Sequence, residues 1–197
     1  AVLRYDDRGV GGSSGDPATA TSADFADDAE AAMRYLQSRA DIDSQQIGLL
    51  GHSEGGMLAA MVAARNPAVA FVISMAGTAV DGYDTLLKQV ERLALASGAS
   101  QEAADIAVVQ QREALDLAMN QDWPALETLI TQIAQEQAAA LSEEQKAALG
   151  DIDAVIQAQV AAQLQAFQSP WYQFFLRYNP ADDLAKVSSP VLGIFGG

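Results

Sequence analysis

The residues with the clearest chemical potential form one short motif, Gly-His-Ser-Glu-Gly-Gly at positions 51–56. An apolar run, 47–50, precedes it, and a stretch of small residues with helical composition, 57–65, follows. A serine in a G-x-S-x-G pattern between a strand and a helix typically forms a tight turn that exposes its hydroxyl. Gly51 and Gly55 supply the small flanking residues that a strained turn requires. The motif therefore predicts that Ser53 is a nucleophile for acyl transfer.

A serine hydroxyl is a poor nucleophile until a base removes its proton. The base is most often histidine, and the sequence contains a single one, His52. Adjacent residues on a tight turn cannot easily direct both side chains to one reaction centre, so we expect His52 to pack beneath the turn. The catalytic histidine is therefore expected to lie outside these residues.

Both ends of the sequence have the composition of strands. Val2–Tyr5 has the composition of a strand at the start of a chain that lacks an initiating methionine, and 191–197 resembles a strand about to enter a loop. The unpaired backbone of a buried strand has no partners for its hydrogen bonds. We therefore expect the sequence to be an internal piece of a longer protein.

Length and composition indicate one domain with an insertion. The sequence has 197 residues, of which 50% are hydrophobic, with many alanines among them. A chain of this length and composition can bury a sizeable, helix-rich core. No apolar run approaches the roughly 18 residues of a membrane span, and no signal peptide is visible. Compartment (cytoplasmic or periplasmic) and oligomeric state stay open.

The net charge and the scarcity of metal-binding side chains argue against several classes of partner. A net charge of −15 disfavours nucleic acid and anionic lipid, because both bind basic patches. One histidine and no cysteine argue against a transition-metal site, and no cofactor is expected. The pairs Asp41/Asp43 and Asp182/Asp183 could hold calcium, but helix-capping or turn roles are favoured for both.

The first part of the sequence alternates strands with helices. Strands are expected at Val2–Tyr5, 47–50 and Ala70–Met75, separated by a glycine-rich loop, 6–17, and by helices. One helix is expected to have Thr21 or Ser22 as its N-cap and to continue to about Arg39, and another follows Ser53 and ends near Asn66. This alternation predicts a parallel sheet and an α/β architecture.

From residue 81 to residue 168 the pattern changes to successive helices. Apolar residues recur at helical spacing, the only proline is Pro124, and no stretch resembles a strand. Ser142 and Gln145 form a capping-box pattern, and that helix is expected to stop at Gly150. The α/β pattern returns with a helix opened by Ser169-Pro170-Trp171 and a strand at Val191–Phe195. We therefore expect a core at 1–80 and 169–197, incomplete at both ends, and a helical insertion at 81–168.

Four motifs carry a resemblance to a known fold. The loop Asp6–Ser13 resembles the D-x-R-G-x-G-x-S loop after the fourth strand of the α/β-hydrolase fold, and 47–56 resembles its fifth strand and nucleophile elbow. The form Gly-His-Ser-Glu-Gly-Gly, with Ser169-Pro170-Trp171 and the later Pro190-Val191-Leu192, is most similar to bacterial EstD-type carboxylesterases. These are close to serine aminopeptidase-like hydrolases. The fold class implied is α/β, a partial α/β-hydrolase parallel sheet with a helical cap, or lid, inserted at 81–168.

The resemblance implies a serine carboxylesterase that acts on small-molecule esters through an acyl-enzyme. Ser53 would be the nucleophile, and the backbone N–H of Glu54 would be one oxyanion-hole donor. The second oxyanion donor would lie before Ala1. The triad acid and the triad base would follow Gly197, so the resemblance places none of these three groups in this chain. Asp81 is an alternative acid, because some lipases place theirs after the corresponding strand. A polypeptide of residues 1–197 alone is therefore predicted to lack esterase activity.

Two other functions stay open beside the esterase. One is an aminopeptidase-type serine peptidase, for which the acidic insertion could supply a carboxylate that anchors the substrate amine. The other is a non-catalytic binding or scaffold protein of the same fold.

The strand order of the α/β-hydrolase fold, 1-2-4-3-5-6-7-8, implies that Val2–Tyr5 does not pair with the strand at 47–50, because the third strand lies between them. The natural substrate and its acyl chain length are not specified by the residues.

Overall fold

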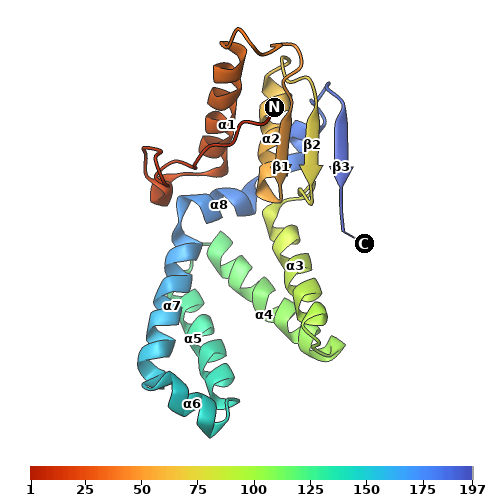
Figure 1. The fold of residues 1–197 in the computed structure, drawn as a ribbon. Coiled ribbons are helices and arrows are strands. Elements are labelled where there is room, and N and C mark those ends of the chain that lie inside the picture. The colour runs from red at the N-terminus through yellow and green to blue at the C-terminus, as the bar shows by residue number, and fades with distance from the viewer. Residues whose placement is uncertain (197) are drawn as a thin grey trace. The chain divides into compact units, whose positions relative to one another are not determined.

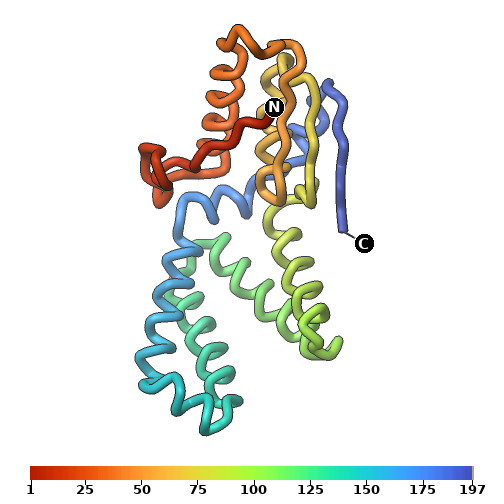
Figure 2. Tube along the Cα trace, viewed as in Figure 1, coloured from red at the N-terminus to blue at the C-terminus, as the bar shows by residue number. Residues whose placement is uncertain are grey.

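The computed structural model describes residues 1–196. The chain forms two compact units. Figures 1 and 2 colour the chain from red at its N-terminus to blue at its C-terminus. The first unit comprises Ala1–Thr85 and the segment from Phe174 onward, and the second comprises Leu86–Gln173. The expected insertion is 81–168. The second unit begins about five residues after the expected start and ends about five residues after the expected end. That the helical unit serves as a cap stays a prediction.

The first unit contains a three-stranded parallel sheet, as the α/β pattern predicts. Its strands are β1 (Leu49–His52), β2 (Val72–Met75) and β3 (Val191–Ile194), in the order β1-β2-β3. β1 and β2 each begin two residues later than expected. Backbone bonding nevertheless starts earlier, since the Ala70 N–H donates to the Ile47 carbonyl at 2.8 Å. The sheet is consistent with part of an α/β-hydrolase fold.

The expected strand at Val2–Tyr5 is wrong. This segment has no strand conformation and is not among the paired strands, in agreement with the expectation that it does not pair with β1. An apolar segment becomes a strand only when a neighbouring backbone supplies its hydrogen bonds, and the sheet of residues 1–196 supplies none here. The glycine-rich loop that follows is a turn region, in which the Val10 N–H donates to the Asp7 carbonyl at 2.9 Å.

The helices of the first unit include α1 (Ser22–Gln37), α2 (Glu54–Arg65) and the short α9 (Pro180–Leu184), with the 3-10 turn η1 (Pro17–Thr19) before α1. Of the two N-cap candidates for α1, Thr21 is the cap, and Asp24 completes a capping box with it. Two helices have residues in both units: α3 (Gly82–Ala96) and α8 (Pro170–Arg177).

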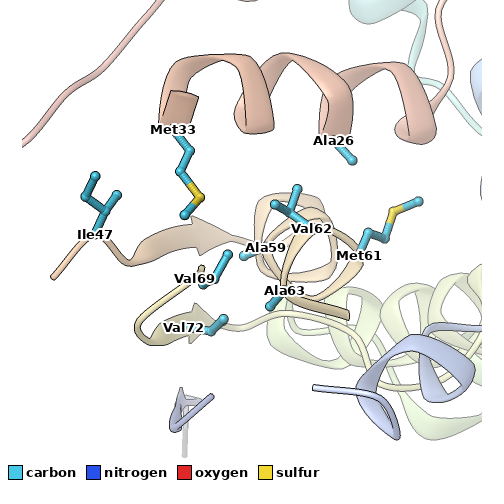
Figure 3. Close-up of a cluster of buried hydrophobic side chains, with 9 residues drawn as sticks. All are labelled: Ala26, Met33, Ile47, Ala59, Met61, Val62, Ala63, Val69 and Val72. Atoms are coloured by element: carbon cyan, nitrogen blue, oxygen red, sulfur yellow. The ribbon is translucent and has the colours of Figure 1, made fainter. Parts of the chain in front are cut away.

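The core of the first unit lies between α1, α2 and one face of the sheet (Figure 3). Val62 on α2 and Ala26 on α1 are fully buried, and Val72 on β2 is 2% exposed. The remaining members of the cluster are Met33, Ile47, Ala59, Met61, Ala63 and Val69. Most of these side chains are small, so the helices lie close to the sheet and α2 is held firmly against β1.

Polar contacts also join α1 to α2. Arg65, near the end of α2, forms ion pairs with Asp27 at 2.5 Å and with Glu30 at 3.0 Å. The Asn66 side-chain amide donates to Glu30 at 3.1 Å. Exposed ion pairs are individually weak, but these contacts fix the C-terminal end of α2 against α1.

The second unit is helical throughout, and the prediction of successive helices without a strand is confirmed for it. It contains α4 (Gln101–Met119), α5 (Trp123–Ala139), α6 (Glu143–Leu149) and α7 (Ile152–Gln168). The Ser142–Gln145 capping box is present, and α6 stops before its C-cap residue Gly150, whose φ is 76°. The core includes Leu126, Ile130, Ala134 and Val160 from the packed pair α5 and α7. No helix of residues 1–196 is both long and apolar enough to cross a membrane.

Candidate active site

Ser53 lies between the last residue of β1 and the first residue of α2, and its backbone is strained. Its φ is 54° and its ψ is −119°, a combination that costs a non-glycine residue on the order of 1–3 kcal/mol. Two hydrogen bonds hold this conformation: the Ser53 N–H donates to the Met75 carbonyl at 2.8 Å, and the Gly56 N–H donates to the Ser53 carbonyl at 3.0 Å. The side chain is exposed. The geometry is that of a strand-turn-helix elbow that presents a serine hydroxyl.

The glycines around Ser53 have unequal importance. A Cβ atom at Gly51 would lie 1.9 Å from the Gly55 carbonyl oxygen, and one at Gly56 would lie 2.9 Å from the Gly77 Cα. A Cβ at Gly55 would meet nothing within 4 Å. The prediction that Gly55 provides needed space is therefore wrong, and Gly56 does so instead, because it faces the end of β2 where Gly77 and Ser74 lie.

Glu54 begins α2, so its backbone N–H is at the positive end of the helix dipole. Its side chain is also engaged. The Ser22 hydroxyl donates to a Glu54 carboxylate oxygen at 2.6 Å, and Ser22 is fully buried. The sequence motif points only to the backbone of Glu54, and Ser22 stands out in the sequence only as a possible helix cap. The two residues are 32 positions apart, and no local spacing pattern connects them.

His52 does not pack beneath the elbow as expected, because its side chain is exposed. Side chains of a strand alternate between the two faces of its sheet. Gly51 faces α2, as the close approach of Gly55 shows, so His52 faces the opposite side, away from the core of the first unit. The sole histidine of the sequence is therefore not part of the packing that supports Ser53.

The loop with the D-x-R-G-x-G-x-S pattern is tied to α1 by Arg8. Its guanidinium donates to both carboxylate oxygens of Asp28, at 2.7 Å and 2.8 Å, and contacts Asp24 at 3.1 Å. The hydrogen bonds to Asp28 raise the pKa of Arg8. Hydrogen bonds from Thr21, with a contribution from Arg8, lower the pKa of Asp24. The loop is thus an anchor for the start of α1, which carries Ser22.

The candidate calcium pairs have protein partners. Asp41 accepts two hydrogen bonds from Arg39, at 2.9 Å and 2.7 Å, and Asp183 contacts Lys186 at 2.9 Å. Among residues 1–196 no group of three or more His, Cys, Asp or Glu side chains is arranged to hold a metal ion. Asp81, the alternative triad acid, accepts a hydrogen bond from the Asp84 N–H at 2.8 Å. This bond gives Asp81 a capping role at the start of α3.

The parallel sheet, the strained serine at the strand-to-helix turn and the helix packed behind it define a member of the α/β-hydrolase superfamily. A family model described as X-Pro dipeptidyl-peptidase (S15 family) matches residues 1–196. The chain therefore belongs to this S15 family, which is part of that superfamily. The match makes the chain a hydrolase domain, and it favours a peptidase at least as much as an esterase.

Proposed function

We propose that the protein containing this domain is a serine hydrolase that forms an acyl-enzyme on Ser53. The observation that carries the proposal is the backbone of Ser53, with φ at 54° and an exposed side chain at the N-terminus of a helix. A fold retains such strain when the residue has a task that a relaxed turn would not permit. Membership of a hydrolase family supports the same conclusion.

The reaction would proceed in two steps. The Ser53 Oγ attacks a substrate carbonyl carbon while a base takes its proton, and the oxygen that becomes negative is held by the Glu54 N–H and a second donor. The tetrahedral intermediate then expels the leaving group, which receives the proton, and water repeats the sequence to release the acyl group. We assign the acid, the base and the second donor to parts of the protein outside residues 1–197, because the only histidine here directs its side chain away from the core that supports the elbow.

Carboxylic esters of small molecules are the first substrate class that we propose. An alkoxide or phenolate departs more readily than an amine, so ester cleavage depends less on proton transfer to the leaving group, although the base is still needed to activate Ser53. The second candidate is a peptide, and the family description favours it specifically, because it names an X-Pro dipeptidyl-peptidase. Amine departure requires proton transfer from the protonated base to the leaving nitrogen, and a free substrate amino group would require a carboxylate close to the elbow.

A chemical probe and two substrates test this function in the full-length protein. A fluorophosphonate should label Ser53, and Ser53→Ala should abolish both labelling and turnover. The matched control is Ser97→Ala, since Ser97 is exposed and its hydroxyl donates to the Ala94 carbonyl at 2.7 Å, within its own helix turn. Faster turnover of a p-nitrophenyl ester than of an X-Pro p-nitroanilide would support the esterase, and the reverse would support the peptidase. No labelling and no turnover would favour the non-catalytic scaffold.

A further inference from the structure

We propose that Ser22 and the side chain of Glu54 are positioning residues that hold the Glu54 backbone N–H in place for the oxyanion. The inference rests on the proposed function, and it adds a role for a side chain and for a residue on another helix. The observation is one contact between elements distant in sequence: the Ser22 Oγ on α1 donates to a Glu54 carboxylate oxygen on α2 at 2.6 Å. Neither residue would touch the substrate through its side chain.

The donor in this contact is fixed. Ser22 has no exposed surface, so its hydroxyl cannot exchange the carboxylate for bulk water without cost. It is the first residue of α1, directly after the N-cap Thr21, whose hydroxyl and backbone N–H both donate to Asp24, at 2.6 Å and 2.9 Å. Arg8 in turn contacts Asp24. The first turn of α1 is therefore held by several bonds, and the Ser22 hydroxyl is a rigid attachment point.

The acceptor is the residue whose backbone matters most for the proposed chemistry. Glu54 directly follows the strained Ser53, and a change in its orientation would move the N–H that faces the reacting carbonyl. α2 is anchored to α1 at its other end through Arg65 and Asn66. The Ser22 contact supplies the corresponding anchor at the catalytic end, so α2 is held at both ends against the same neighbour.

The contact also controls where the negative charge of Glu54 lies. A carboxylate at a helix N-terminus is drawn toward the same amide N–H groups that would hold the oxyanion. In that position it would compete with the substrate oxygen and repel its developing charge. The hydrogen bond from Ser22 keeps one carboxylate oxygen on the α1 side, so the N-terminus of α2 stays available to the substrate.

Three variants of the full-length protein test the inference by steady-state kinetics, with active sites counted by fluorophosphonate titration. Ser22→Ala and Glu54→Ala should each lower kcat about tenfold, less than the ~10²–10³ lost when an oxyanion donor is removed. KM should change less than about twofold, because the loss falls on the transition state. Glu54→Gln retains an oxygen that accepts from Ser22 and should recover at least about fivefold in kcat over Glu54→Ala.

The matched control is Ser38→Ala, at the opposite end of α1, where the Ser38 hydroxyl donates to the Tyr35 carbonyl at 2.7 Å and is exposed; it should leave kcat unchanged. If Ser53→Ala retains turnover, the proposed function itself fails. If Ser53→Ala is inactive but Glu54→Ala keeps kcat within about twofold of the parent, the positioning role alone is wrong. The role is equally wrong if Glu54→Gln is no better than Glu54→Ala. Should Ser22→Ala not fold, the Ala and Gln variants of Glu54 decide the question.

Discussion

At the scale of single residues, the elbow combines a strained serine with glycines of different function. Ser53 takes a backbone conformation that glycine adopts without cost, yet the chain has a serine there. Gly51 and Gly56 are required by the close approach of the turn to itself and to the end of β2, whereas Gly55 borders open space. The stability of the elbow therefore depends on named backbone contacts, and those can be tested one residue at a time.

Substitution of Ser53 should separate activity from stability. Ser53→Ala removes the nucleophile and leaves the backbone strain, so we expect loss of turnover with little change in Tm. Ser53→Gly relieves the strain but increases the entropy of the unfolded chain, and the net effect should be a gain of about 1 kcal/mol in the free energy of unfolding. Thermal and denaturant unfolding of the two variants measure this difference. A lower stability for the glycine variant would show that the conformation is not strained in solution.

The two adjacent glycines at the start of α2 form a matched pair. Gly56→Ala places a methyl group 2.9 Å from the Gly77 Cα, and we expect it to destabilise the protein by about 1–3 kcal/mol through overpacking. Gly55→Ala adds a methyl group in open space and should leave stability unchanged or raise it by up to about 1 kcal/mol, because alanine favours the helix. Urea midpoints of the two variants provide the measurement. Equal effects would contradict the geometry of the elbow.

At the scale of elements, the sequence predicts most helices and their caps but not the limits of the strands. The Ser142–Gln145 box and the stop at Gly150 depend on local geometry, so their spacing is visible in the sequence. Val2–Tyr5 has the composition of a strand but lacks the conformation, because strands depend on a partner that local composition does not specify. The Ser22–Glu54 contact was not predictable for the same reason, since it joins two helices that the sheet brings together.

The first turn of α1 should make stability sensitive to acid. Hydrogen bonds from Thr21 and the contact with Arg8 lower the pKa of Asp24 below its ordinary 3.8. A carboxyl with a depressed folded pKa stabilises the fold above its unfolded pKa, and this contribution is lost as pH falls through the folded pKa. We therefore expect Tm to fall more between about pH 5 and about pH 3 in the parent protein than in Asp24→Asn. Because Asp24 is close to solvent, the difference should be small and should shrink in high salt.

At the scale of the whole molecule, the sheet of the first unit is covered by α1 and α2 on one face. The opposite face carries Leu50, Met75, Leu192 and Ile194, which are 65%, 36%, 55% and 47% exposed. The register places Ile73 of the central strand between Leu50 and Leu192, and Met75 between His52 and Ile194. Parallel sheets are normally buried on both faces, so this exposed apolar row departs from an ordinary α/β arrangement.

The exposed row should be detectable in solution. A polypeptide of residues 1–197 alone should bind the dye ANS and associate at micromolar concentration, since contiguous apolar patches on a sheet promote association. Leu50→Lys with Leu192→Lys should reduce both dye binding and association, while the matched pair Leu93→Lys with Val109→Lys, at exposed positions of the helical unit, should have a smaller effect. A monomer that does not bind the dye would show that this face is covered in solution.

The same polypeptide should lack hydrolytic activity. It has the nucleophile on a strained turn and one oxyanion donor, but its only histidine faces away from the core that supports Ser53. Loss of the base typically lowers turnover by on the order of 10⁴-fold or more, and what remains arises from binding and the oxyanion hole. We therefore expect hydrolysis of p-nitrophenyl acetate by residues 1–197 at the rate of buffer, with no decrease on Ser53→Ala. Hydrolysis above that rate which Ser53→Ala removes would mean that a base within these residues reaches the serine, and the assignment of the acid and base to other parts of the protein would have to be withdrawn.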